Sequence, residues 1–223
     1  MLTSADIVDA LRRGAVTIAR HEALLDRLDA ALGDGDHGAN MVVGLDAVVA
    51  ALGDRYVDGG RVDAGRADIG DLLRLVGHTL VSSVGGASGP LYGTAFIEAG
   101  FAFAGASSLD LAEVADAFEV GTAALARRGR CAVGDKTILD ALEPAMRVLR
   151  EATHVDRPLP DAFADAAIAA RAGMIATIPM VARRGLALRL GERSRGHQDP
   201  GATSCFLLVR AISARADRFA RLS

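Results

Sequence analysis

Residues 29–41 read Asp-Ala-Ala-Leu-Gly-Asp-Gly-Asp-His-Gly-Ala-Asn-Met, an acidic stretch that interrupts an alanine- and leucine-rich chain. Its three aspartates, spaced five and two residues apart, cannot share one face of a continuous helix. Gly33 and Gly35 let the backbone curl, so three carboxylates can meet, those of Asp29, Asp34 and Asp36. A hard divalent cation such as Mg²⁺ would relieve their repulsion. The alternative is a solvated acidic turn that caps the next helix.

On both sides of this stretch, apolar residues recur at helical intervals. Before it, Ile7, Leu11 and Leu25 follow that spacing behind Thr3 and Ser4, either of which can serve as the N-cap. Abundant alanine and leucine and few aromatic residues also favour helices. Further helices are expected over residues 38–52, 67–84, 90–104, 109–128, 137–152, 159–184 and 202–216. No internal repeat or linker marks a boundary, so residues 1–223 are predicted to form one all-α domain.

The composition argues against several classes of protein. The formal net charge of -3 does not suit a nucleic-acid partner, which requires clustered positive charge. No apolar run approaches the roughly 18 residues of a membrane span, and the amino terminus lacks a signal-peptide pattern. We therefore expect a soluble, cytoplasmic protein with no membrane contact. The two cysteines, Cys131 and Cys205, have no nearby Cys or His partners, which argues against a disulfide framework or a zinc site.

A second polar segment, residues 82–94, reads Ser-Ser-Val-Gly-Gly-Ala-Ser-Gly-Pro-Leu-Tyr-Gly-Thr. A helix would end in the paired glycines, and Ser88 could cap the next helix. Small side chains here would let a bound phosphate approach the backbone closely. A tight turn between two packed helices would explain the same glycine and proline residues, and the sequence leaves both interpretations open.

A third segment, residues 129–137, reads Gly-Arg-Cys-Ala-Val-Gly-Asp-Lys-Thr and misses the P-loop pattern by one residue, since Asp135 stands before Lys136. The residues before it predict a helix where a P-loop requires a strand, so we reject a P-loop. We expect Asp135 to cap a helix that starts near Thr137. Lys136, the only lysine in the chain, is either structural or close to an anion.

A fourth segment, residues 190–204, contains Asp199 as a suitable N-cap and Pro200 as a suitable first helical residue. The polar residues before them, Arg193, His197 and Gln198, have little structural use in a helical domain and predict a lid over a binding site. All four segments fall at expected helix ends. Because helix amino termini present unpaired N–H groups, these ends could together surround a polyphosphate.

In this order, the four segments resemble the L subunit of dihydroxyacetone kinase, which is also the second domain of single-chain dihydroxyacetone kinases. The resemblance rests on Gly-Asp-Gly-Asp-His-Gly-Ala-Asn-Met, Ser-Ser-Val-Gly-Gly-Ala-Ser-Gly-Pro-Leu, Gly-Asp-Lys-Thr and Gly-Glu-Arg-Ser-Arg-Gly-His-Gln-Asp-Pro-Gly-Ala-Thr-Ser. It implies a barrel of about eight antiparallel helices with the nucleotide site in the loops at one end. It also implies ADP or ATP as the cofactor, together with Mg²⁺, which we expect as two ions.

Carried over by position, the family's magnesium ligands fall on the aspartates that the spacing selected, Asp29, Asp34 and Asp36. The implied nucleotide contacts come from all four segments and are His37, Gly38, Ala39, Asn40, Ala87, Ser88, Gly129, Ile138, Asp199, Pro200 and Gly201. Ile138 would form an apolar wall for adenine, where the family often has methionine. Leu186 stands where the family often has a nucleotide-contacting arginine, and Arg184 or Arg189 could compensate.

The resemblance also implies partners. A separate substrate-binding K subunit would hold dihydroxyacetone, or a related short keto-sugar, covalently on a histidine. The bound ADP would be rephosphorylated by a phosphotransferase-system phosphocarrier, the M subunit, or else ATP would exchange freely, and a homodimer is a further assembly to consider. Two alternative functions stay open: the nucleotide subunit of a fatty-acid-kinase-like system, and a non-catalytic, nucleotide-dependent regulatory module.

Overall fold

The computed structural model describes residues 1–56 and 68–213. In chain order the elements are β1 (Leu2–Thr3), α1 (Ser4–Ala30), α2 (His37–Tyr56), α3 (Ile69–Ser83), α4 (Ser88–Ala102), β2 (Ser108–Leu109), α5 (Leu111–Gly129), α6 (Leu139–Thr153), α7 (Leu159–Ala176), the 3-10 helix η1 (Leu186–Ser194) and α8 (Pro200–Ser213). The two strands only pair Leu2–Thr3 with Ser108–Leu109, antiparallel. The predicted all-α fold is confirmed. The expected helix limits at residues 67 and 216 lie outside the described residues.

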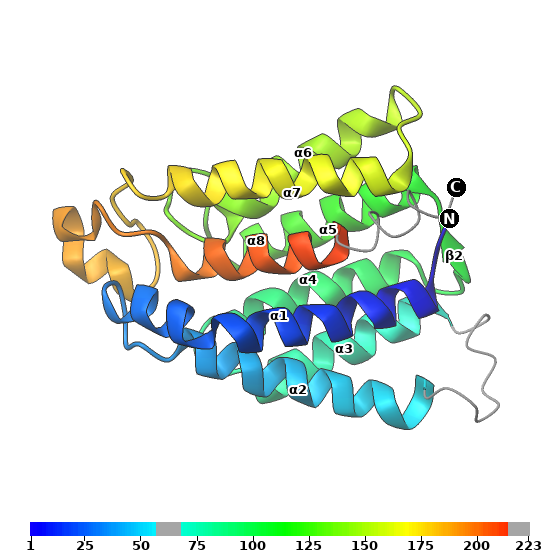
Figure 1. The fold of residues 1–223 in the computed structure, drawn as a ribbon, viewed down its shortest axis with the longest axis horizontal. Helices are drawn as coiled ribbons and strands as arrows, with labels where there is room; N and C mark the ends of the chain where they lie inside the picture. Colours follow the sequence, from blue (N-terminus) through cyan, green and yellow to red (C-terminus); the bar gives the residue numbers. More distant parts are fainter. Residues whose placement is uncertain (57–67, 214–223) are drawn as a thin grey trace.

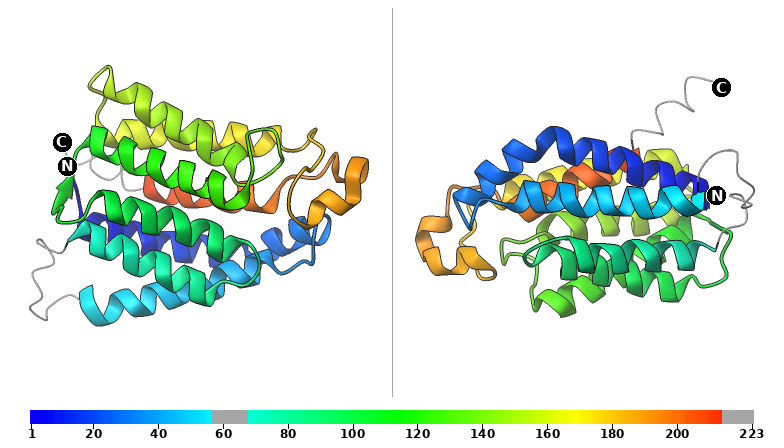
Figure 2. Two further views of the ribbon diagram at one scale, coloured as in Figure 1. Left: turned by 180° about the vertical axis from the view of Figure 1, so that it is seen from behind. Right: turned by 90° about the horizontal axis from the view of Figure 1, so that it is seen from below.

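The α-helices close into a barrel. Each one packs against the next in the chain, and α8 packs against α1, which completes the ring (Figures 1 and 2). Successive helices run in opposite directions, so alternate connections gather at the same end. The connections α1–α2, α3–α4, α5–α6 and α7–α8 lie at the left-hand end in Figure 1, and they contain the four polar segments.

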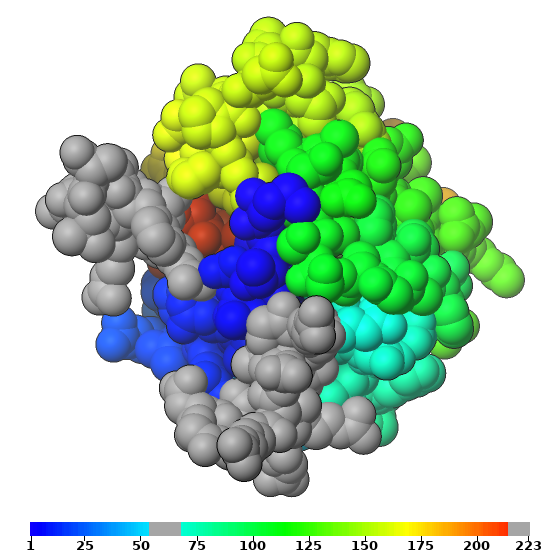
Figure 3. Space-filling view, turned by 90° about the vertical axis from the view of Figure 1, so that its right-hand side faces the viewer, coloured from blue at the N-terminus to red at the C-terminus, as the bar shows by residue number. Residues whose placement is uncertain are grey.

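The opposite end of the barrel carries the other connections. Figure 3 looks onto it and shows the start of α1 beside the segments that join α4 to α5 and α6 to α7. Thr3 begins α1 with a capping box, because its side chain accepts from Asp6 N and Asp6 accepts from Thr3 N. Of the two candidate N-caps, Thr3 is therefore the one used, and Ser4 is the first helical residue.

Close helix packing depends on glycine at the contact between α3 and α4. A Cβ atom on Gly77 would lie 2.6 Å from the carbonyl oxygen of Gly93, and one on Gly93 would lie 2.7 Å from that of Gly77. Because both distances are far below van der Waals contact, a side chain at either position would push the helices apart. The core inside the ring is aliphatic, with Ile18, Leu25, Leu72 and other apolar side chains fully buried.

The helix expected over residues 38–52 continues to Tyr56, and two further expectations at helix ends are wrong. The helix expected to reach residue 184 ends at Ala176, because Ile178 precedes Pro179 and a residue before proline disfavours helical geometry. Ser88 does not cap α4 but is its first residue, and its hydroxyl contacts His37 instead of the helix backbone. Among the described helices, none is long and apolar enough to cross a membrane.

Candidate functional site

A cavity of about 490 Å³ opens at the end of the barrel where the four polar segments meet. Most of the site residues expected from the sequence line it, namely Asp29, Asp34, Asp36, His37, Asn40, Ala87, Ser88, Gly129, Ile138, Asp199, Pro200 and Gly201. Gly38 and Ala39 do not line it. The barrel thus brings together segments that lie up to about 170 residues apart in the chain.

The α1–α2 turn gathers three carboxylates at the edge of this cavity. One oxygen from each of Asp29, Asp34 and Asp36 lies within 4.8 Å of the others. Gly35 adopts a φ of 83°, which favours glycine, and this bend turns its N–H toward Asp29. Asp29 Oδ2 accepts from Gly35 N at 2.9 Å and from Asp36 N at 3.1 Å. The backbone therefore holds one oxygen of Asp29 and fixes the side chain in the cluster.

The three carboxylates of this cluster repel one another. Burial raises the pKa of Asp29, and Asp34 raises it further, while the two backbone N–H groups lower it. Asp34 and Asp36 are exposed and can turn toward a ligand. Three carboxylates with no cationic side chain in the group are a hard-oxygen donor set, which fits Mg²⁺ and leaves room for water and phosphate ligands.

The start of α2 is already occupied by a side chain that the sequence interpretation missed. Asp26, on the last turns of α1, accepts from Gly38 N at 2.7 Å and from Ala39 N at 3.1 Å. These two N–H groups are therefore directed at α1 and away from the cavity. A signal was present, since Asp26 precedes Asp29 by three residues and so lies on the same helix face.

His37 joins three helices at the cavity wall. Its Nε2 lies 3.0 Å from Ser204 Oγ on α8, and its Nδ1 lies 3.2 Å from Ser88 Oγ on α4. Burial lowers the pKa of His37 to about 4, so the ring is neutral at pH 7, with one donor and one acceptor nitrogen. The buried hydroxyl of Tyr92 lies 3.0 Å from Ser204 Oγ and extends the chain of hydrogen bonds. Tyr92 and Ser204 were not expected from the sequence.

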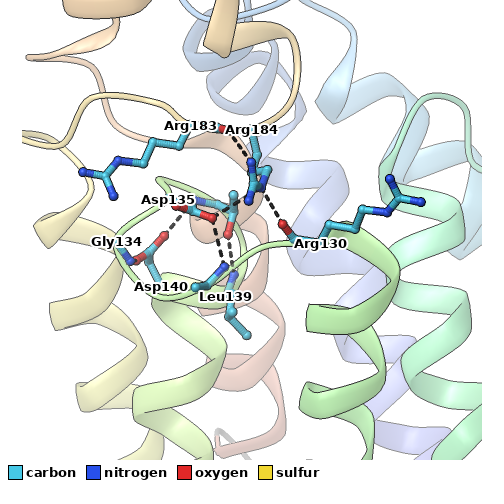
Figure 4. A network of polar contacts seen from close by, with 9 residues as sticks. Arg130, Gly134, Asp135, Leu139, Asp140, Arg183 and Arg184 are labelled. Carbon is cyan, nitrogen blue, oxygen red and sulfur yellow. Dashed lines mark hydrogen bonds and ion pairs between the residues drawn. The ribbon is translucent and has the colours of Figure 1, made fainter.

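The α5–α6 loop is organised by Asp140, which corrects the role expected for Asp135 (Figure 4). Helix α6 starts at Leu139, and the Asp140 carboxylate accepts from Gly134 N at 2.6 Å and from Thr137 N at 2.7 Å. Asp135 accepts from Ala132 N at 3.0 Å, so it closes the loop and does not cap the helix. The local pattern could not distinguish these two aspartates, because both lie close to the helix start.

Arg184 holds the rim of the cavity against the same loop. Its Nε donates to the carbonyl oxygen of Arg130 at 2.5 Å and lies 3.4 Å from Asp135 Oδ2 (Figure 4). Arg184 lines the cavity beside Leu186, whereas Arg189 does not line it. Of the two arginines considered as substitutes for the family arginine at Leu186, only Arg184 is therefore in reach of the site.

The segment before α8 agrees with the sequence only in part. Asp199 accepts from Ala202 N at 2.7 Å with Pro200 as the first helical residue, which confirms the expected cap. Burial raises the pKa of Asp199 to about 7, although the Ala202 N–H and Lys136 both lower it. Arg193, His197 and Gln198 do not line the cavity, and their role as a lid over a bound ligand stays a prediction. Gln198 Nε2 instead donates to Thr203 Oγ1 at 2.9 Å.

Lys136 is the least expected member of the cavity wall. It is only 2% exposed, and its Nζ donates to the carbonyl oxygens of Thr177 at 2.7 Å, of Met180 at 3.3 Å and of His197. Burial lowers the pKa of Lys136, while the charge of Asp199 raises it. Of the two roles left open by the sequence, these contacts support the structural one.

The chain is similar to known proteins in sequence and in fold. The sequence pattern of the DAK2 domain matches residues 31–214. The "PEP-dependent dihydroxyacetone kinase, ADP-binding subunit DhaL" of Escherichia coli (strain K12) is 39% identical over 218 residues, which cover 96% of this chain and 98% of that subunit. The L-erythrulose 1-kinase of Mycolicibacterium smegmatis is 36% identical over 213 residues, and the matched part covers 96% of this chain and 36% of that kinase. The crystal structure of the dihydroxyacetone kinase from C. freundii with AMP-PNP and Mg²⁺ matches with a TM-score of 0.72 at 25% identity, covering 95% of this chain and 34% of that one.

Proposed function

Because this chain belongs to the DAK2 domain family, we infer that it is the nucleotide-binding subunit of a dihydroxyacetone kinase. It serves phosphoryl transfer to dihydroxyacetone or a related short keto-sugar. The relatives are named for the phosphorylation of short ketoses, which favours this function over the fatty-acid-kinase-like and regulatory alternatives. We treat residues 1–223 as one domain, since α1 contributes Asp29 and closes the barrel although it precedes the matched residues 31–214.

The observation that carries the proposal is the group of three carboxylates within 4.8 Å at the cavity edge. Asp29, Asp34 and Asp36 would hold Mg²⁺, and we propose two ions, because three carboxylates and a diphosphate offer more oxygen ligands than one octahedral ion uses. Bound there, magnesium would neutralise phosphate charge during transfer. The fixed oxygen of Asp29 keeps the cluster in place, and the two exposed carboxylates can adjust to the ligand.

The phosphates would lie near the helix amino termini that share the cavity with the carboxylates. Residues 85–88, which lead into α4 and include its first residue Ser88, and the start of α8, at Pro200 and Gly201, both line the cavity. No side chain caps α4, so its first N–H groups and its partial positive charge favour an anion. At the start of α8, Asp199 already accepts from Ala202 N and Pro200 has no N–H, so that end contributes mainly the N–H of Gly201. The start of α2 is not available for this role, because Asp26 occupies its N–H groups. We therefore place the phosphates between the carboxylates and the starts of α4 and α8.

The other side of the cavity suits a base. Leu91 and Ile138 give the cavity apolar surface near the α5–α6 loop, since a Cβ atom on Gly129 would lie 3.1 Å from Leu91, and this supports the expected adenine wall at Ile138. Arg184 stands at the rim and is half exposed, so its guanidinium can approach a bound nucleotide without full desolvation. Phosphoryl transfer depends mainly on positioning and charge neutralisation, which these groups can supply.

The ketone and the phosphoryl donor would come from partners. We propose a separate substrate-binding subunit, and a phosphocarrier that restores the phosphate on bound ADP, since the relative in E. coli is a PEP-dependent, ADP-binding subunit. Such an assembly would work in the cytoplasm, where phosphoenolpyruvate is made. A homodimer of this chain is a separate proposal that analytical ultracentrifugation would test.

Calorimetric titration with ADP tests the site. We expect binding in MgCl₂, loss of binding in EDTA, and loss of binding in Asp36→Asn at the same Mg²⁺ concentration. Asp46→Asn is the matched control, because Asp46 is exposed on α2 and does not line the cavity. Magnesium-independent ADP binding, or equal affinity in all three proteins, would refute the site. Adding a substrate-binding subunit with dihydroxyacetone, and either ATP or a phosphoenolpyruvate-fed phosphocarrier, then identifies the donor.

A further inference from the structure

Lys136 is chemically exceptional in this chain. It is the only lysine among 25 lysine and arginine residues, and it is among the most deeply buried side chains of the described structure. Arginine fills the other basic positions, and most of the arginines among the described residues are exposed. The only side-chain ammonium group of this chain therefore lies in the interior.

The reason lies in the geometry of the acceptors. Three carbonyl oxygens, from Thr177, Met180 and His197, converge on Nζ. An ammonium group has three donors in a tetrahedral arrangement, so this set of acceptors satisfies all of them. A guanidinium is planar and longer, and it cannot direct three N–H groups at one such pocket of oxygens. With no donor left over, Lys136 is not a phosphate ligand, although it lines the cavity.

The acceptors flank the segment between α7 and α8 that contains η1. We call residues 177–180 and 196–199 the two stems of this segment. Thr177 and Met180 precede η1, and His197 follows it. The stems also bond to each other directly, since Gly196 N donates to Ile178 O at 2.8 Å and Asp199 N donates to Thr177 Oγ1 at 3.0 Å. Lys136 joins this pair of stems to the α5–α6 loop, which no other buried cation among the described residues does.

The position of Lys136 connects these stems to the cavity wall. Ile138, two residues on, lies against Gly201, where a Cβ atom would be 3.5 Å from Ile138 N. Asp199, whose charge acts on Lys136, lines the same wall. The backbone of Lys136 has a φ of 63°, a left-handed conformation that is unfavourable for a residue other than glycine. The hydrogen bonds of its side chain help to stabilise this conformation.

We propose that Lys136 is a positioning residue, an internal ammonium clamp that joins the two stems beside η1 to the α5–α6 loop. It thereby holds the part of the cavity wall that contains Ile138 and Asp199. This inference rests on the proposed nucleotide site. It assigns the ammonium to the protein backbone and not to the ligand, and it explains why arginine does not replace it.

Acetylation of the wild-type protein tests the clamp without any variant. The chain has only two kinds of amine, Lys136 and the amino terminus, so peptide mapping after treatment with acetic anhydride separates them. We expect acetylation of the terminus alone, with and without Mg²⁺ and ADP. Rapid acetylation of Lys136 in the free protein, or protection that appears only with ADP, would overturn the clamp, because the ammonium would then be free or bound to phosphate.

Two variants and a control test the positioning role. Lys136→Met and Lys136→Arg should both weaken ADP binding in MgCl₂ by about ten- to a hundred-fold, since displacement of the wall misplaces the ligand. Hydrogen exchange should accelerate in residues 177–199 of both variants and stay unchanged in α3. Leu149→Ala is the control, because Leu149 is buried on α6 away from the cavity, so it lowers the melting temperature but keeps the wild-type ADP affinity.

Each result bears on one claim. If Lys136→Met binds ADP within two-fold of wild type, or if Lys136→Arg restores wild-type affinity, the proposal is wrong. Failure of the wild-type protein to bind ADP would instead count against the nucleotide site, while the acetylation pattern would still report on the clamp. If neither variant folds, the wild-type protein still tests the clamp. Fast hydrogen exchange in residues 177–199 together with fast acetylation of Lys136 would contradict the proposal.

Discussion

Replacing Asp34 with asparagine should change the stability of the protein in opposite directions with and without ligand. In the free protein Asp34 lies within 4.8 Å of the carboxylates of Asp29 and Asp36, and its charge contributes to the raised pKa of Asp29. Asparagine keeps the size of the side chain and removes the charge. The free variant should therefore be more stable than wild type, whereas the variant with Mg²⁺ and ADP should be less stable.

The size of both effects follows from the separation of the charges. At 4.8 Å, two unit charges repel by about 0.9 kcal/mol in a water-like medium and by about 3.5 kcal/mol at an effective dielectric constant of 20. Asp34 is exposed, so the lower figure applies, and loss of two repulsions should stabilise the free protein by roughly 1–2 kcal/mol. For a chain of this size that is a rise of about 2–8 °C in melting temperature.

Ligand reverses the order. Mg²⁺ and ADP at 100 times the dissociation constant should stabilise wild type by about 2.7 kcal/mol, or about 5–11 °C. The variant should show little of this shift, because one magnesium ligand is missing. Differential scanning calorimetry in EDTA and in MgCl₂ with ADP measures both effects, with Asp46→Asn as the control.

Salt provides an internal check. The stabilisation of the free Asp34→Asn variant should shrink between 0.05 and 0.5 M NaCl, since ions screen exposed charges. A free variant that melts below wild type would show that the carboxylates do not repel one another. A ligand-induced shift equal to that of wild type would show that Asp34 does not bind the metal, and either result would refute the reasoning.

The remaining predictions concern burial and packing. Burial raises the pKa of Asp199 to about 7 from 3.8, so ionisation opposes folding, and the ligand-free protein should lose up to about 1.4 kcal/mol per pH unit as pH rises between these values. Asp199→Asn should lack this loss in urea unfolding at pH 5 and pH 7.5. Gly173→Ala should destabilise the fold by about 1–3 kcal/mol in urea, because the new Cβ would lie 2.0 Å from Asp140 O. Tyr92→Phe should cost about 1 kcal/mol through the lost contact with Ser204, and an ADP affinity changed more than ten-fold would show that the phenol acts on the ligand.

The glycine prediction has a matched control in the same type of helix. Gly53 lies in α2, and no described residue would come within 4 Å of a Cβ atom there. Gly53→Ala should therefore be neutral, or stabilising by up to about 1 kcal/mol, because alanine has the higher helix propensity. Equal destabilisation by both substitutions would show that close contact is not the cause. For Asp199, a wild-type stability that does not fall between pH 5 and pH 7.5 would contradict a raised pKa.

Local sequence signals predicted most of the framework. Apolar spacing and composition predicted the helices. Capping chemistry located the start of α1 at Thr3 or Ser4, of which the structure uses Thr3, and the start of α8 at Asp199. Apolar spacing predicted a helix up to residue 184, but Pro179 disfavours helical geometry before it and α7 ends at Ala176. Once the helices alternate in direction, alternate connections must share one end, so the common location of the four polar segments followed from the order of the elements.

The sequence by itself determined the chemistry of the acidic turn, because Gly33, Gly35 and the three aspartates lie within eight residues and local backbone geometry suffices to gather them. Only the tertiary structure decided which distant groups meet. Lys136 finds acceptors 41 to 61 residues away, and His37 meets Ser204 across 167 residues. Such contacts depend on how the barrel closes. No spacing rule encodes them, since each partner taken alone is compatible with many other surroundings.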